Sequence, residues 1–218
     1  LSVLTVVQCI LDICQADGEC CLVDAEEALH LGSRGCLILR GVRGHARAGS
    51  RAGSGIGTAA ILMAKAIGCT VYTTVGDDEK GRKAAELGAD YVVNYKTERF
   101  EGEVRRLTKR KGVDVVFEHV GADTWNGSLL CLKRGGRLVT CGATSGASAT
   151  INLMQLFQQQ YRITGSFGCR IENIRQSLDK MAAGMKPVID SVFPLEDFEK
   201  GLARLEGRQV FGKVVVTF

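Results

Sequence analysis

Short runs of β-branched and other apolar residues alternate along this chain with longer segments whose apolar residues recur every three or four positions. The short runs are typical of strands that are buried on both faces of a parallel sheet. The longer segments predict amphipathic helices, because residues at that spacing share one helix face. The predicted strands are Val71–Val75, Tyr91–Tyr95, Val113–Val120, Arg137–Cys141 and Arg162–Phe167.

Capping residues define the expected boundaries of the helices between these strands. Asp77 or Asp78 is expected to cap a helix that stops at Gly88, since a carboxylate accepts bonds from the first helical amides and glycine suits the position after a helix. Thr97 is expected to cap the next helix. The apolar face of that next helix consists of Phe100, Val104 and Leu107.

A third helix is expected to begin at Asp123 or Thr124, to bury Leu129 and Leu132, and to end at Gly135–Gly136. Strand, helix and strand repeated in this way predict right-handed crossovers. The chain is therefore expected to adopt an α/β fold with a doubly wound parallel sheet. The remaining elements expected are a helix over Ile171–Ala183, a strand over Val188–Phe193 and a helix over Leu195–Glu206.

Ligands of such a sheet bind outside the carboxyl ends of its strands, where the connecting loops leave the sheet. The corresponding loops of this chain are rich in Gly, Ser, Thr and Asp, which suits a groove lined by backbone and is also typical of ordinary turns. These loops are 52–57, 76–80, 120–123, 142–146 and 166–170. Five such loops at one edge favour a binding groove there.

The run Ala52–Gly57 is followed directly by an apolar helical segment and then by a strand. A glycine turn that opens a helix lets the backbone approach a pyrophosphate, and the amides at the helix start point at its charge. The strict Gly-x-Gly-x-x-Gly pattern would place glycine where Ala52 and Ser54 stand, so the match is incomplete. The motif alone does not separate a cofactor site from a simple turn.

From Ala52 to Phe218 the chain resembles the nucleotide-binding half of the medium-chain dehydrogenase/reductase superfamily, close to its quinone oxidoreductase and zinc-type alcohol dehydrogenase branches. The matching stretches are AGSGIGTAAILMAKAIG, DDEKGRKAAELGADYVVNY, GVDVVFEHVGADTW, LKRGGRLVTCGATSG, RITGSFG and FGKVVVTF. This resemblance implies a Rossmann-like fold that binds NAD(P), and a hydride transfer to or from the nicotinamide ring. It also implies a homodimer through the edge strand Arg162–Phe167.

The resemblance assigns roles to single residues. The pyrophosphate would be held by Gly53, Ser54, Gly55, Ile56 and Gly57, with Lys213 touching it. The nicotinamide side would be lined by Val120, Gly121, Gly142, Ser166 and Phe167. No residue is nominated as a catalytic acid or base, and Lys213 is equally well explained as a surface lysine on an edge strand.

The expected cofactor is NADP, with NAD as the alternative. Val75 stands where NAD-preferring relatives place an acid, and it carries no charge that would repel a 2′-phosphate. Lys80 and Tyr95 match positions that contact this phosphate in NADPH-using quinone reductases. Each also has a simpler interpretation, Lys80 as a solvated lysine on a helix face and Tyr95 as an aromatic residue at a strand end.

Residues 1–51 depart from the resemblance. Six acidic residues and no lysine or arginine occur in 1–33, whereas 34–51 contain five arginines and no acid. The first strand should lead straight into the glycine turn, but Gly44–Arg51 is a poor strand by composition. Either Cys36–Leu39 serves as this strand with a long insertion after it, or the central strand is degraded. The sharp break near Arg51 raises the hypothesis that the N-terminal portion was translated out of its ancestral frame or joined from elsewhere.

The expected division has three parts. Residues 1–51 form an atypical, partly disordered segment, residues 52–170 the dinucleotide-binding domain, and residues 171–218 C-terminal helices and strands. The resemblance implies that this third part is a remnant of the family's catalytic domain, most of which would precede the glycine turn.

Composition and cysteine spacing argue against several other classes. The arginine-rich stretch invites a nucleic-acid interpretation, but residues 1–71 offer no aromatic residue for base stacking and the net charge is only +4. Nine cysteines at irregular spacing, with no leader sequence, predict a reducing, cytoplasmic location and no metal site, zinc included. The apolar start of the chain is interrupted by Asp12 and is too short to span a membrane.

Two function classes follow from the sequence. The first is an NAD(P)(H)-dependent oxidoreductase that acts on an alcohol, aldehyde, quinone or enone. The second is a non-catalytic remnant of such an enzyme that binds NADP(H) without turnover.

Overall fold

Six parallel strands form one sheet in the order β3-β2-β1-β4-β5-β6. The computed structural model describes residues 36–40, 54–66 and 68–218. This order, with parallel pairing throughout, is the doubly wound arrangement that the sequence predicts. The strands are β1 (Cys36–Arg40), β2 (Thr70–Val75), β3 (Tyr91–Asn94), β4 (Val113–Glu118), β5 (Leu132–Thr140) and β6 (Arg162–Gly165).

The central strand of the sheet is β1. It pairs in parallel with β2 on one side and β4 on the other, with Leu37 opposite both Val71 and Val115. Of the two alternatives for the first strand, the structure therefore shows the one in which the Cys36 run serves in the sheet. Residues 41–53, which follow it and include Gly44–Arg51, lie outside the described residues. The division at residue 52 stays a prediction, with the sheet itself reaching back to Cys36.

Helices cover both faces of the sheet, and each face has its own apolar cluster. One cluster joins α3 and α4 to alternate strand residues such as Val71 and Val75, and the other joins α5 and α6 to residues such as Tyr72. This alternation arises because successive strand residues point to opposite faces. The helices are α3 (Gly55–Ala66), α4 (Asp78–Glu86), α5 (Phe100–Leu107), α6 (Ala122–Cys131), α7 (Leu153–Gln159) and α8 (Ile171–Ala182).

One helix cap agrees with the sequence prediction and another does not. Asp77 caps α4, and its carboxylate accepts a hydrogen bond of 2.8 Å from the Lys80 amide. The predicted cap Thr97 is wrong, because α5 begins later, after Arg99, and its N-cap makes no side-chain hydrogen bond. The burial of Phe100, 6% exposed, at the first position of α5 explains this start better than any capping bond.

The predicted end of the third helix is also wrong. Helix α6 ends at Cys131, and Leu132 already has extended backbone angles and begins β5. Leu132 is 1% exposed and pairs with Val113, so its burial in the sheet ends the helix before Gly135–Gly136 is reached. The two glycines instead lie within β5, next to an irregularity in its pairing with β4.

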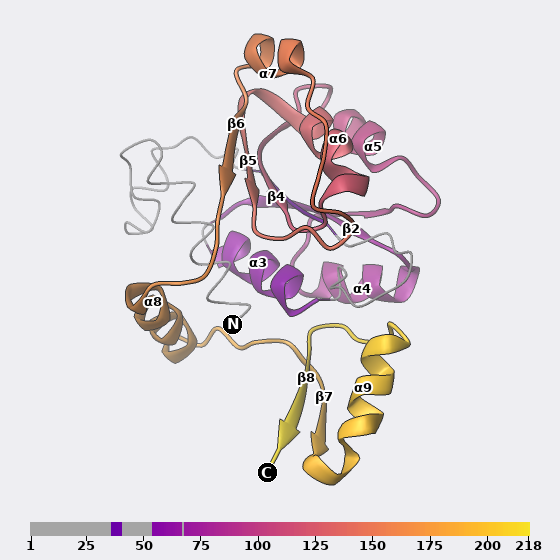
Figure 1. The fold of residues 1–218 in the computed structure, drawn as a ribbon, viewed down its shortest axis with the longest axis vertical. Coiled ribbons are helices and arrows are strands. Elements are labelled where there is room, and N and C mark those ends of the chain that lie inside the picture. The colour runs from indigo at the N-terminus through magenta and orange to yellow at the C-terminus, as the bar shows by residue number, and fades with distance from the viewer. Residues whose placement is uncertain (1–35, 41–53, 67) are drawn as a thin grey trace.

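The C-terminal residues form a separate small unit of two parallel strands and a helix. Its elements are β7 (Ile189–Pro194), the short 3₁₀ helix η1 (Leu195–Asp197), α9 (Phe198–Glu206) and β8 (Lys213–Thr217). Asp190 ties the unit together, because its carboxylate accepts bonds of 2.9 Å from both Arg204 and the Phe211 amide. Figure 1 shows this unit extending beyond α3 and α4.

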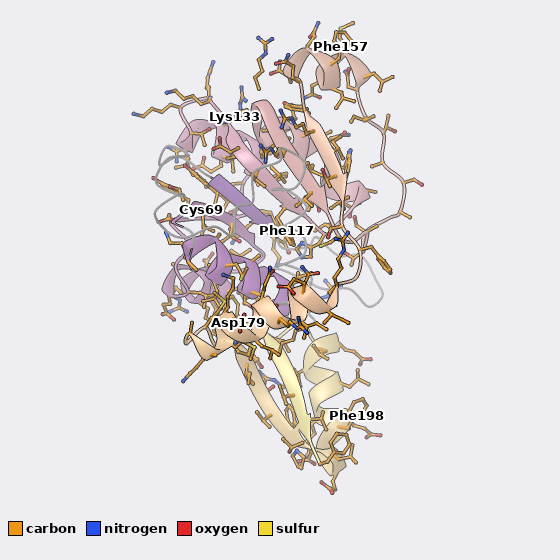
Figure 2. All side chains as sticks on the ribbon, turned by 90° about the vertical axis from the view of Figure 1, so that its left-hand side faces the viewer. Cys69, Phe117, Lys133, Phe157, Asp179 and Phe198 are labelled. Atoms are coloured by element: carbon orange, nitrogen blue, oxygen red, sulfur yellow. The ribbon has the colours of Figure 1, made fainter. Side chains whose placement is uncertain are left out.

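Exposed apolar side chains gather at the two ends of the molecule. Leu153 and Phe157 on α7 are each 66% exposed, and Phe198 on α9 is 51% exposed. Figure 2 labels Phe157 and Phe198 at these opposite ends. Helix α7 was not predicted, since it is short and buries none of its residues. Within the described residues, no helix has the length and apolarity needed to cross a membrane.

Candidate functional site

The first part of the candidate site is the start of α3. Ser54 caps this helix: its carbonyl accepts a bond of 3.0 Å from Thr58 and its hydroxyl accepts one of 3.2 Å from the Gly57 amide. Gly55 and Gly57 are buried, and the first turn carries no acidic residue. The amides at this helix start carry partial positive charge, which suits an anion. Gly53, also predicted to hold the pyrophosphate, lies outside the described residues.

The side chain of Lys213 lies across this helix start. A Cβ atom added to Gly55 would come within 2.6 Å of Lys213 Cδ and closer still to Cε, so glycine is what allows the lysine to approach. Ser54 and Gly212 form a parallel backbone bridge that holds β8 in place here. Partial burial lowers the pKa of the Lys213 ammonium below its ordinary value. An anion bound at this position would meet a lysine and the helix amides together.

The second part lies where β2 ends. A Cβ atom on Gly76 would be 2.5 Å from the Tyr95 hydroxyl oxygen, so Tyr95, 6% exposed, packs directly over the backbone there. Lys80 Nζ donates a bond of 2.5 Å to the Arg208 carbonyl and lies 3.8 Å from an oxygen of Asp77. Lys80 is therefore held at this strand end by contacts on both sides and is not a freely solvated lysine.

The third part lies beyond β4 and β5. Gly121 has φ 97° and forms a bridge with Gly146, and a Cβ on it would be 2.6 Å from the Gly146 carbonyl oxygen. A Cβ on Gly142 would be 2.9 Å from the His119 carbonyl oxygen. At these two glycines the loops approach each other backbone to backbone, which a side chain would prevent. Val120, between them in the turn, is fully buried.

The last two predicted residues follow β6 and have very different surroundings. The Ser166 amide donates a bond of 2.8 Å to Thr140, and Ser166 is 7% exposed. Phe167 is completely exposed. Its predicted role beside a nicotinamide ring stays a prediction.

Sequence reasoning missed two residues that shape the site. Gly76, directly after β2, provides the space that Tyr95 fills. Glu118, the last residue of β4, is fully buried and bonds the turn that follows. The signal for Glu118 was present, because an acidic residue at the end of the apolar strand Val113–Glu118 requires internal hydrogen-bond donors.

The described residues do not suggest a metal centre. Within 36–40, 54–66 and 68–218, no group of three or more His, Cys, Asp or Glu residues is arranged to hold an ion. His119 is 2% exposed and packs its ring 6.0 Å from that of Phe117, as a core residue does. We therefore derive no chemical step through zinc.

The strand order, the glycine-opened helix and its lysine define a nucleotide-binding α/β domain. The family model described as zinc-binding dehydrogenase matches residues 55–183. The chain belongs to this family, within the medium-chain dehydrogenase/reductase superfamily.

Individual relatives agree with this assignment. A quinone oxidoreductase of Salmonella typhimurium is 41% identical over 115 residues, which are 53% of this chain and 34% of the relative. A 2-haloacrylate reductase of a Burkholderia species is 32% identical over 183 residues, 79% of this chain and 54% of the relative. A solved NAD-dependent alcohol dehydrogenase matches all of this chain and 57% of its own, with a TM-score of 0.78 and 34% identity. The chain spans about half the length of such relatives.

Proposed function

We propose that this chain binds NADP(H) along the carboxyl edge of its sheet and is the cofactor-binding part of an oxidoreductase. The whole enzyme would transfer a hydride between the cofactor and an alcohol, aldehyde, quinone or enone. The observation that carries the proposal is the position of Lys213 across the glycine-opened start of α3. A lysine and the partial positive charge of the helix amides at one point form a site for a diphosphate.

Different residues at the carboxyl edge of the sheet would bind different parts of the cofactor. Ser54, Gly55, Ile56 and Gly57 would receive the pyrophosphate through backbone amides, with Lys213 as counter-charge. The Val120–Gly121 turn and Gly142 would receive the nicotinamide half, together with Ser166 and Phe167. The cofactor supplies the hydride chemistry, and the protein binds the cofactor and orients its ring.

The preference for NADP over NAD is argued from the end of β2. Val75 is uncharged, Tyr95 brings a hydroxyl over Gly76, and Lys80 brings an ammonium to the same loop. Together they present a donor and a positive charge to a ribose 2′-phosphate. Asp77 and Asp78 lie beside Lys80 and oppose this charge, so the size of the preference depends on the balance between them.

A homodimer is the assembly that we propose. Strand β6 is the outermost strand on its side of the sheet, and neither Ile163, 37% exposed, nor Phe157 on the preceding helix α7 is buried. The predicted edge Arg162–Phe167 would extend the sheet into a second copy of the chain. Unpaired edge strands with exposed apolar residues favour such pairing.

Fluorescence titration of the pure chain with NADPH and with NADH tests the binding proposal. The expected result is saturable binding of both, with NADPH the tighter ligand. Adding a quinone or an aldehyde and following NADPH absorbance then separates an active enzyme from a binding protein without turnover. Absence of saturable binding to either cofactor would contradict the proposal.

A further inference from the structure

Glu118 is the most unusual buried group in the described part of the chain. It ends β4, has no exposed surface, and its carboxylate accepts four hydrogen bonds. One oxygen accepts from the Val120 amide at 2.7 Å and the Gly121 amide at 3.3 Å. The other accepts from the hydroxyls of Thr124 at 2.9 Å and Ser128 at 2.5 Å. A carboxylate suits this position because it has acceptor sites for all four donors.

The turn that Glu118 holds is joined to the loop after β5. The Val120 carbonyl accepts bonds from the Ser145 amide at 2.7 Å and the Ser145 hydroxyl at 2.9 Å. The Ala122 amide donates to the Gly146 carbonyl at 3.2 Å. The buried Glu118 carboxylate therefore holds the Val120–Gly121 turn, and the Val120 carbonyl holds the neighbouring Ala143–Gly146 loop. Both loops belong to the part of the edge assigned to the nicotinamide half.

Loss of the carboxylate would leave the Val120 and Gly121 amides and the Ser128 hydroxyl without this buried acceptor, whereas the Thr124 hydroxyl keeps the Gly121 carbonyl at 3.2 Å. Buried donors without a partner are costly, so the turn would rearrange to find new ones. Gly121 is tied to the neighbouring loop, because it forms a backbone bridge with Gly146 and the next amide, that of Ala122, donates to the Gly146 carbonyl. Rearrangement of the turn would therefore displace the loop as well.

We propose that Glu118 is a positioning residue for the nicotinamide half of the cofactor, acting through the Val120–Gly121 turn and the Ala143–Gly146 loop. Its carboxylate is too deeply buried to touch the cofactor itself. The inference rests on the proposed function. A group that the cofactor never contacts thus sets the rigidity of the Val120–Gly121 turn and the Ala143–Gly146 loop. The phosphate-binding residues at Ser54–Gly57 and Lys80 do not depend on this group.

The experiment compares two ligands on Glu118→Gln and on the unchanged chain. The ligands are NADPH and 2′-phospho-ADP-ribose, which lacks the nicotinamide ring. Glutamine keeps the size of the side chain but offers an acceptor on one side only. The expected result is about a tenfold weaker binding of NADPH, with a reduced emission change of the bound nicotinamide. Binding of 2′-phospho-ADP-ribose should change less than about twofold, because none of its contacts depends on the Val120–Gly121 turn or the Ala143–Gly146 loop.

Two further variants keep the result interpretable. Ser145→Ala removes a donor to the Val120 carbonyl and leaves all four bonds of Glu118 intact, so it should show the same selective loss if Glu118→Gln fails to fold. Asp90→Asn is the matched control: its carboxylate accepts from the Val71 amide at 2.7 Å at the opposite end of β2. This control should leave both affinities unchanged.

Equal losses for both ligands in Glu118→Gln and Ser145→Ala would show a merely structural role and overturn the inference. Unchanged affinity for both ligands would overturn it as well. If the unchanged chain binds neither ligand, the proposed function itself fails and the inference fails with it.

Discussion

Replacement of Lys213 by methionine should weaken cofactor binding while it stabilises the protein without cofactor. The lysine lies across the start of α3, where helix amides already carry partial positive charge. Burial lowers the pKa of Lys213 from its ordinary value of 10.5, which means that the ammonium is less well solvated here than in water. A bound anion compensates for this lost solvation. Removal of the lysine therefore removes the desolvation cost in the cofactor-free protein and also the attraction between the lysine and the cofactor phosphates.

The magnitude for binding follows from the kind of contact. A hydrogen bond to a charged group contributes about 1.5–3 kcal/mol, and every ~1.4 kcal/mol is a tenfold change in affinity. Lys213→Met should therefore raise the Kd for NADPH roughly 10- to 100-fold. Lys111→Met is the control, because Lys111 lies before the start of β4, at the opposite end of the sheet. It should leave the Kd unchanged.

The pH dependence has a definite sign. A bound pyrophosphate raises the pKa of Lys213, so binding is strongest while the lysine is protonated and weakens as pH rises through its lowered pKa. In the folded, cofactor-free protein the same lowered pKa means that the unfolded chain binds more protons between that pKa and 10.5. Stability therefore rises with pH through this window, and below it the partly desolvated ammonium is destabilising.

Calorimetric titration between pH 7 and 10, and urea unfolding without cofactor, measure the two effects. Lys213→Met should bind NADPH weakly with little pH dependence over this range and should unfold at higher urea concentration than the unchanged chain. Unaltered NADPH affinity in Lys213→Met, with the same pH profile as the unchanged chain, would refute the reasoning.

Three further predictions concern other parts of the edge and of the surface. Asp77→Asn keeps a good helix cap and removes a negative charge beside Lys80. The affinity for NADPH relative to NADH should therefore rise about threefold without loss of stability. Lys80→Met should lower the ratio of NADPH affinity to NADH affinity. Gly121→Ala should destabilise the protein by about 2 kcal/mol in urea unfolding, because its positive φ and the nearby Gly146 carbonyl leave no space for a methyl group; an unchanged midpoint would contradict this. Ile163→Lys should convert the proposed dimer to a monomer in light scattering, and a mass equal to that of the unchanged chain would exclude β6 as the interface.

The alternation of apolar runs and amphipathic segments was enough to predict strands β2 to β6, whereas the central strand β1 was left as one of two alternatives. Strands buried on both faces, such as Val71–Val75 and Val113–Glu118, are recognisable locally because they are short and rich in β-branched residues. Helix ends were less predictable, since the end of α6 is decided by the burial of Leu132 against Val113, a residue far from it in sequence. This tertiary contact outweighs the tendency of Gly135–Gly136 to end a helix.

The site was predictable only in part, for a similar reason. The glycine turn is visible as a local motif, and the resemblance to a family pointed to Lys213, which the fold then brings to the start of α3. The role of Gly76 depends on Tyr95, which arrives from another strand, and that of Glu118 depends on donors from α6. Gly76 and Tyr95 meet only when β2 and β3 pair, whereas the donors to Glu118 are close in sequence but reach it only through the turn that joins β4 to α6.

The most direct test of the central claim is a map of backbone amide chemical shifts by NMR during titration with NADPH. The account predicts that the largest saturable changes occur at Gly55, Ile56 and Gly57, and that changes at the Val120–Gly121 turn accompany them. Changes confined to other parts of the chain, or no change at millimolar NADPH, would contradict binding of the cofactor at the carboxyl edge of this sheet.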